Sequence, residues 1–276
     1  MAQHLALRKF DVAAAKDATV TVIIGKRNSG KSQMTADWLF HKRHIPVCVV
    51  MSNTEAATGF FKNTCGVPEA YIFNEWTPGA IDRFLDTQER KAKARLADPS
   101  LPISSCLIVL DDLAFDKSIF NSTQMRRLLM NGRHYHVTCV ITAQYLGDLP
   151  TYFRTNVDYA VAYRTPGVHD RERLWKNFFG VVPSLHIFTE VLGNVTENYG
   201  CLVVDNNTQS NTFTDAISWY KAPLRSPTVG SFRVGCTVYR QYARARARRE
   251  EESPDQPPPV PAATSRRPVI NIKKMR

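Results

Sequence analysis

The sequence predicts an α/β protein whose mainly parallel sheet carries helices on both faces. Apolar runs rich in β-branched residues alternate with stretches of helical periodicity, which is typical of such sheets. A glycine-rich loop over residues 25–32 also separates the first apolar run from the first helical stretch. We expect a core over residues 1–225 and a basic, proline-rich, disordered tail over 226–276.

The expected strands are the apolar runs, and the most apolar of them, residues 106–110, ends in two aspartates. A run of this kind bounded by polar residues is typical of a buried strand. The full set of expected strands is 19–24, 46–51, 70–73, 106–110, 137–142, 159–163, 200–204 and 212–220.

Four stretches carry apolar residues at helical spacing. In the longest, Ile81, Phe84, Leu85 and Gln88 share one face, and the charged remainder is expected to face solvent. The expected helices are 33–40, 78–97, 118–130 and 170–178.

The loop has the sequence pattern G-x-x-x-x-G-K-[ST], formed by Gly25, Lys26, Arg27, Asn28, Ser29, Gly30, Lys31 and Ser32. Its converging backbone N–H groups and the following helix N-terminus favour an anion, Lys31 can reach the β- and γ-phosphates, and Ser32 can offer its hydroxyl to Mg²⁺. The preceding strand and the following helix are the context that this pattern requires. The sequence therefore predicts a site for a nucleoside triphosphate and Mg²⁺.

Two acids and a glutamine follow neighbouring apolar runs. Asp111 closes the 106–110 run and is expected to hold Mg²⁺ beside Ser32, directly or through water. Asp112 is expected to polarise the attacking water. Gln144, at the end of the next strand, could contact the γ-phosphate or the water, although many such glutamines only satisfy backbone groups.

Two arginines are candidates for completing a neighbouring subunit's site. Arg133 comes just before the strand at 137–142, and Arg154 just before the strand at 159–163. An arginine that projects across a subunit boundary can supply positive charge to a transition state. Both residues could equally be ordinary surface arginines, and the choice between them stays open.

Composition narrows the class of partner. The 276 residues carry a formal net charge of +11, which favours a polyanionic partner, nucleic acid first.

The six cysteines lie far apart without a C-x-x-C pair, so buried free thiols in a reducing compartment are expected. No apolar run approaches the length of a membrane span. Beyond about residue 240 arginines, glutamates and prolines dominate, which predicts disorder, with a nucleic-acid contact as one of several open roles.

The combination of these segments resembles the FtsK–HerA superfamily of DNA-pumping ATPases, and within it the genome-packaging ATPases of nucleocytoplasmic large DNA viruses. The similar segments run from about residue 10 to 222 and include 23–32, 51–55, 109–112, 131–135 and 141–144.

The resemblance implies a RecA-like core of the ASCE type, homo-oligomeric rings with ATP sites at subunit interfaces, and ATP hydrolysis coupled to translocation of double-stranded DNA. It also implies action in the host cell cytoplasm at the site of viral assembly, with the virion as a second location. Capsid or inner-membrane virion proteins would be further partners. Asp112 stands where many members of the superfamily have Glu.

The leading hypothesis is therefore a motor that packages viral DNA into a preformed capsid. A P-loop kinase acting on nucleosides or nucleotides is the main enzymatic alternative, although its usual arginine-rich lid is missing from the expected core. A guanine-specific GTPase is disfavoured because no N-K-x-D run follows the core strands. A third reading is a DNA-associated structural protein that binds ATP without hydrolysing it.

Overall fold

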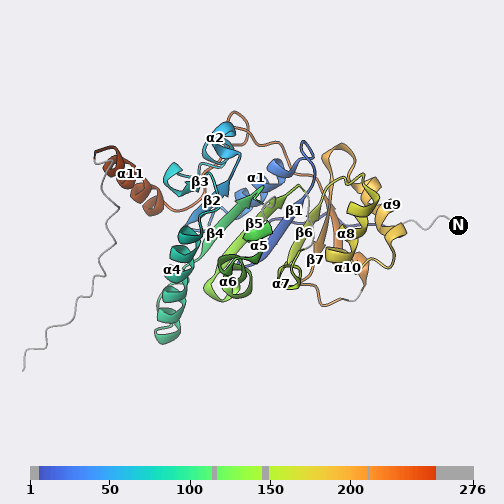
Figure 1. Cartoon of the computed structure of the whole chain (residues 1–276), viewed down its shortest axis with the longest axis horizontal. Coiled ribbons are helices and arrows are strands. Elements are labelled where there is room, and N and C mark those ends of the chain that lie inside the picture. The colour runs from blue at the N-terminus through green and yellow to red at the C-terminus, as the bar shows by residue number, and fades with distance from the viewer. Residues whose placement is uncertain (1–5, 114–116, 145–148, 211, 253–276) are drawn as a thin grey trace, which may run out of the picture.

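The computed structural model describes residues 6–113, 117–144, 149–210 and 212–252, which form one eight-stranded sheet with helices on both faces (Figure 1). The strand order is β3-β2-β4-β5-β1-β6-β7-β8. The strand bounds are β1 Val20–Ile24, β2 Cys48–Ser52, β3 Ile72–Phe73, β4 Cys106–Asp111, β5 Val137–Ala143, β6 Tyr159–Ala162, β7 Cys201–Asp205 and β8 Ile217–Tyr220.

The first six strands in the chain pair in parallel, and β7 is antiparallel to both β6 and β8. This confirms the mainly parallel sheet. The strand β1 lies centrally between β5 and β6 and is buried along its whole length, which suits its β-branched sequence Val-Thr-Val-Ile-Ile.

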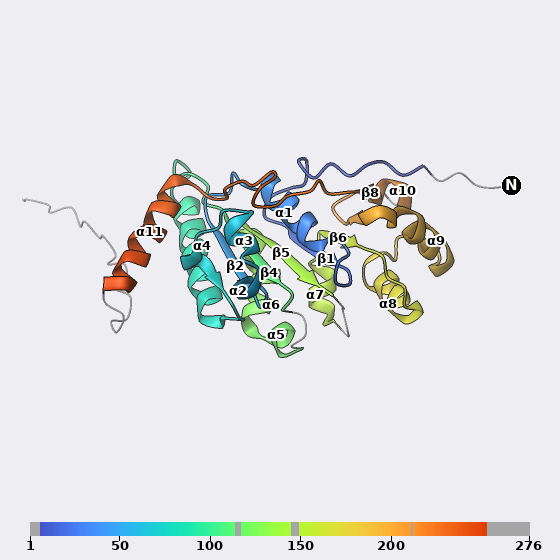
Figure 2. The same cartoon turned by 90° about the horizontal axis from the view of Figure 1, so that it is seen from above.

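Two apolar clusters cover the two faces of the sheet, and β1 contributes to both. Val22 and Ile24 pack with the helices α4 to α9, whereas Ile23 packs with Met34 and Trp38 of α1. The two helical layers lie on opposite sides of the strands when the molecule is seen from above (Figure 2).

The α-helices are α1 Lys31–His41, α2 Glu55–Thr58, α3 Phe60–Asn63, α4 Pro78–Ala97, α5 Lys117–Asn121, α6 Thr123–Asn131, α7 Thr151–Thr155, α8 Val168–Phe178, α9 Leu185–Val195, α10 Phe213–Ala216 and α11 Thr237–Glu252. Three 3₁₀ turns are η1 Glu69–Tyr71, η2 Gly132–Tyr135 and η3 Glu197–Tyr199.

Two expected elements were wrong in part. The helix expected over 118–130 is two helices, α5 and α6, because Ser122 leaves the helical conformation and its Oγ accepts a hydrogen bond from Met125 N as an N-cap. The strand expected over 212–220 is shorter, since Phe213–Ala216 forms a helical turn and only Ile217–Tyr220 pairs with β7.

The expected disorder beyond residue 240 is wrong for residues 240–252, which belong to α11. Residues between 226 and 237 also join the core: Phe232 N, Val234 N and Cys236 N donate to backbone carbonyls of residues 64, 65 and 46. Tyr239 is buried, donates its hydroxyl to Cys48 O and stacks on Tyr71 with ring centroids 4.4 Å apart. The rest of the expected tail, 253–276, lies outside the described residues.

All six cysteines are free, and five of them are buried, as the sequence led us to expect; Cys236 is exposed. Burial raises the pKa of the Cys106 thiol to about 12, so this thiol stays protonated at neutral pH.

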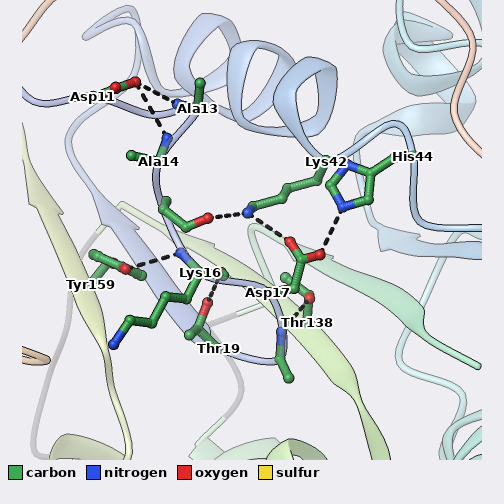
Figure 3. Close-up of polar contacts among 12 residues, drawn as sticks. Asp11, Ala13, Ala14, Lys16, Asp17, Thr19, Lys42, His44, Thr138 and Tyr159 are labelled. Carbon is green, nitrogen blue, oxygen red and sulfur yellow. Dashed lines mark hydrogen bonds and ion pairs between the residues drawn. The ribbon is translucent and has the colours of Figure 1, made fainter. Parts of the chain in front are cut away.

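The segment before β1 is tied to the end of α1 by a partly buried polar group (Figure 3). Lys42, which follows α1, donates from Nζ to Ala15 O and, over 2.7 Å, to Asp17 Oδ1. His44 Nε2 lies 2.7 Å from the other Asp17 oxygen. Burial would raise the pKa of Asp17, but the hydrogen bonds from His44 and Lys42 outweigh it and lower that pKa. These contacts hold the two ends of the strand–loop–helix unit together.

We expect Lys42→Met to lower the free energy of unfolding by about 1–3 kcal/mol, because Ala15 O and Asp17 lose a shared buried donor. His44→Ala is the matched control on the same carboxylate, and its exposed side chain should contribute less than about 1 kcal/mol. Urea denaturation of nucleotide-free protein measures both. Equal effects of the two substitutions would contradict the assignment of Lys42 as the anchor.

Candidate functional site

The glycine-rich loop lies at the carboxyl edge of the sheet, between the end of β1 at Ile24 and the start of α1 at Lys31. Gly25 N donates to Ala143 O of β5 over 3.1 Å, which fixes the start of the loop. Gly30 has φ +106°, a left-handed conformation that side chains disfavour, and no side chain caps α1. The first turn of α1 therefore has no side-chain acceptor of its own, as expected of an anion-binding helix terminus.

Tyr163, the residue after β6, packs against this loop. Its hydroxyl donates to Gly30 O over 3.2 Å, and a Cβ added at Gly25 would lie 2.7 Å from Tyr163 Cβ. Gly25 is thus required by close packing and Gly30 by its backbone angle. Burial raises the pKa of Tyr163, so its ring acts as a neutral support for the loop.

Lys31 folds back onto the loop in this structure. Its Nζ donates to Gly25 O and, over 2.9 Å, to Lys26 O. Burial lowers the pKa of Lys31, while the nearby carboxylates of Asp112 and Asp111 act in the opposite direction. The lysine predicted to contact phosphate is therefore half-buried and close to both predicted acids.

Hydroxyl groups from the two neighbouring strands hold the carboxylate of Asp111. Ser52 ends β2 and donates to Asp111 Oδ2 over 2.8 Å, and Thr142 of β5 donates to Oδ1 over 2.6 Å. Both residues are paired with Asp111 in the parallel register, so the sheet itself sets these distances. The bonds fix the orientation of this carboxylate at the end of β4.

Asp112 leaves the strand with φ 52°, and its backbone N donates to Thr142 Oγ1 over 3.0 Å. The Gln144 side chain donates from Nε2 to Asp112 Oδ2. Thr142 thus bridges the two acids, and Gln144 and Asp112 are in direct contact, as their positions at adjacent strand ends predict.

These groups surround one pocket of about 900 Å³. Lys31, Ser32, Asp111, Asp112 and Gln144 all line it. Other lining residues are Lys26, Arg27, Asn28, Ser29, Gly30, Gln33, Thr54, Thr58, Tyr163, Tyr199, Lys221, Ala222 and Leu224.

The oxygen groups of this pocket suit Mg²⁺, which prefers hydroxyl, carboxylate, phosphate and water ligands. Ser32 and Asp111 are the lining residues that could hold it. Within the described ranges no three His, Cys, Asp or Glu side chains gather into a metal-binding group.

Neither candidate arginine lines the pocket of its own chain. Arg133 lies in η2, before β5, and pairs with the buried Asp158, whose other oxygen accepts from Val20 N over 2.8 Å. Arg154 lies in α7 and contacts Asn177 Oδ1 at 3.4 Å. Because η2 precedes a strand parallel to β1, Arg133 lies at the sheet edge opposite the loop.

Sequence reasoning missed the hydroxyls of Ser52 and Thr142, and it missed Tyr163. All three stand at the carboxyl ends of predicted parallel strands, and that position was the available signal. It also missed the contribution of Tyr199 and Leu224, which come from segments far from the loop in sequence.

Three curated viral proteins are similar to this chain over most of its length. The uncharacterized protein 088R of Invertebrate iridescent virus 3 is 34% identical over 221 residues, covering 80% of this chain and 82% of that protein. The uncharacterized protein 015R of Frog virus 3 (isolate Goorha) is 37% identical over 226 residues, covering 82% of this chain and 67% of that protein. The uncharacterized protein L437 of Acanthamoeba polyphaga mimivirus is 32% identical over 234 residues, covering 82% of this chain and 80% of that protein. No protein-family model matches.

Solved structures with a similar fold are more distant in sequence. The genome packaging NTPase B204 from Sulfolobus turreted icosahedral virus 2, in complex with AMP, superposes with a TM-score of 0.54 at 14% identity, covering 76% of this chain and 100% of that chain. The pCW3 conjugation coupling protein TcpA, with ATPγS, superposes with a TM-score of 0.55 at 12% identity. The match covers 75% of this chain and 60% of the TcpA chain. The chain belongs to the family of viral proteins that includes 088R and 015R, and it shares its fold with B204 and TcpA.

Proposed function

We propose that this protein is an ATPase whose hydrolysis cycle drives double-stranded DNA into a preformed viral capsid. The observation that carries the proposal is the single pocket in which Lys31, Ser32, Asp111, Asp112 and Gln144 converge. A P-loop alone would fit any nucleotide-binding protein. A strand-end acid pair with a polar residue on the adjacent strand is what hydrolysis additionally requires.

In the proposed site the loop amides and Lys31 hold the β- and γ-phosphates. To reach them, Lys31 exchanges its bonds to Gly25 O and Lys26 O for bonds to phosphate oxygens. Ser32 and Asp111 would hold Mg²⁺, which when bound neutralises charge on the β- and γ-phosphates. Ser52 and Thr142 keep Asp111 oriented toward this end of the pocket.

Asp112 is the proposed base that orients the attacking water, and Gln144 fixes its carboxylate. The Gln144 amide donates to one Asp112 oxygen, which leaves the other oxygen to accept a hydrogen bond from water. The shorter Asp in place of a Glu is accommodated because its left-handed backbone carries the residue out from the strand end.

The proposed active form is a homo-oligomeric ring in which Arg133 or Arg154 enters the neighbouring subunit's pocket. The position of Arg133 supports a role in the neighbouring subunit. Arg133 lies at the sheet edge opposite its own loop, and its side chain is 59% exposed. A head-to-tail ring brings such opposite edges together. Within its own chain the Arg133 guanidinium is paired with the Asp158 carboxylate.

DNA as the moving substrate is supported by the net charge of +11 and by the fold shared with the packaging NTPase B204. The function places the protein in the host cell cytoplasm where virions assemble, or in the virion, with capsid or inner-membrane virion proteins as docking partners. None of the helices in the described part of the chain has the length and apolar content to span a membrane.

Addition of duplex DNA should stimulate ATP hydrolysis, and Lys31→Ala should reduce the stimulated rate by about 100-fold or more, because a group that stabilises transition-state charge is lost. Lys93→Ala on the exposed face of α4 is the matched control and should retain the rate. Phosphate release with and without DNA measures both. ATP turnover indifferent to DNA would favour the P-loop kinase, and binding without turnover would favour the structural protein.

Asp112→Asn should leave ATP binding intact and slow hydrolysis by about 100-fold, because the amide cannot accept the water's proton. Asn tolerates the left-handed backbone of this position, so the variant should fold. Equilibrium binding and single-turnover hydrolysis separate the two effects. Loss of ATP binding would instead assign Asp112 to metal binding or to folding.

Mixing Arg133→Ala protein with Lys31→Ala protein should restore activity that neither has alone. In a randomly mixed ring about a quarter of the interfaces join an intact loop to an intact arginine. Arg154→Ala in place of Arg133→Ala is the matched comparison, and the pair that complements identifies the arginine acting in trans. If neither pair complements at any ratio, the proposal of an arginine in trans is wrong.

A further inference from the structure

We propose that Tyr199 and Leu224 form the subsite that holds the nucleotide base, and that they bind it by stacking rather than by reading its edge. The inference rests on the proposed function, since the base would be attached to a triphosphate in the glycine-rich loop. Both residues line the pocket of that loop, yet Tyr199 is 66% and Leu224 67% exposed. Large apolar side chains that remain exposed within a ligand pocket provide a surface for an apolar part of the ligand.

The sheet topology brings these two segments to the loop. β7 is antiparallel to β8, and Cys201 at the start of β7 pairs with Tyr220 at the end of β8. Because β6 is parallel to β1 and antiparallel to β7, the start of β7 and the end of β8 lie at the carboxyl edge of β1. Tyr199 comes two residues before this pair, and Leu224 four residues after it.

The turn that carries Tyr199 is strained and fixed. Asn198 has φ 50° and Tyr199 φ 66°, both in the left-handed region that non-glycine residues seldom adopt. A Cβ added at the next residue, Gly200, would lie 2.1 Å from Val195 O, so the chain has no alternative residue there. Strained backbone of this kind occurs preferentially at ligand clamps. The strain holds a tyrosine ring at the mouth of the pocket.

The segment that carries Leu224 is anchored to α1 by a buried carboxylate. Asp37 of α1 is fully buried and accepts hydrogen bonds from Arg225 Nη2 at 2.8 Å and Tyr220 Oη at 2.6 Å. The Arg225 guanidinium also lies 3.7 Å from the centroid of the Phe40 ring. Residues on both sides of 221–224 are therefore fixed to the helix whose N-terminus faces the phosphates.

The polar groups near this end of the pocket offer little for recognition of a base edge. The Gln33 side-chain oxygen already accepts from Arg225 N over 2.7 Å. Ala222 and Leu224 are apolar, and Lys221 is a flexible cation. A stacking site accepts different bases because every base has a π-face. The substrate class is then nucleoside triphosphates in general, with ATP and GTP bound comparably.

The test measures the affinity of the full chain for each of three compounds, ATP, GTP and inorganic tripolyphosphate. Tripolyphosphate has no base. Tyr199→Asn removes the ring, and Asn tolerates the left-handed backbone. We expect Tyr199→Asn and Leu224→Ala each to weaken ATP and GTP binding by about 5- to 50-fold. Tripolyphosphate binding should be unchanged, and Tyr199→Phe should bind ATP as the unmodified chain does. Val229→Ala, an exposed apolar residue outside the pocket lining, is the matched control.

Unchanged ATP affinity in Tyr199→Asn and Leu224→Ala would overturn the proposal. Equal weakening of ATP and tripolyphosphate would overturn it too, because the residues would then support the loop rather than the base. Strong preference of the unmodified chain for one purine would refute recognition by stacking alone. Failure of the proposed function is distinguishable, since it would abolish DNA-stimulated phosphate release and leave these binding affinities as expected.

Discussion

The parallel register of β4, β5 and β1 is the constraint on which the site depends. Asp111 is paired with Thr142, and Ile24 with Ala143, so the loop and the strand-end acids leave the sheet at almost the same level. A shift of one residue in either pairing would turn alternate side chains to the opposite face. The apolar clusters on both faces oppose such a shift, because each strand buries side chains on both sides. The hydrophobic core thus sets the positions of the polar groups of the site.

The polar groups of the site stabilise one another. Asp111 accepts from the hydroxyls of Ser52, Thr142 and Thr54, Asp112 from Gln144, and Lys31 donates to the carbonyls of its own loop. Buried or half-buried charges without such partners would be costly. In the proposed function the Lys31 side chain is the group that must change partners.

The C-terminal part of the described chain is integrated with the core. Arg225 is paired with Asp37 under the first helix, and Tyr239 packs onto the edge of the sheet at Cys48 and Tyr71. The first contact fixes the wall of the pocket beside the glycine-rich loop, and the second fixes the start of α11.

The sequence by itself determined the local units: the parallel strands, the glycine-rich loop, α4 with its ends at Pro78 and Ala97, and the two acids after β4. These follow from periodicity and from residues whose backbone preferences act over a few positions. Only the tertiary structure decided that Ser52 and Thr142 hold Asp111, that Tyr163 supports the loop, and that Tyr199 and Leu224 reach the same pocket. It also showed that residues 240–252 belong to a helix whose Tyr239 is buried against Cys48 and Tyr71, residues far from it in the chain. Such contacts join residues far apart in the chain, and their energies depend on strand order and packing, which no local pattern encodes.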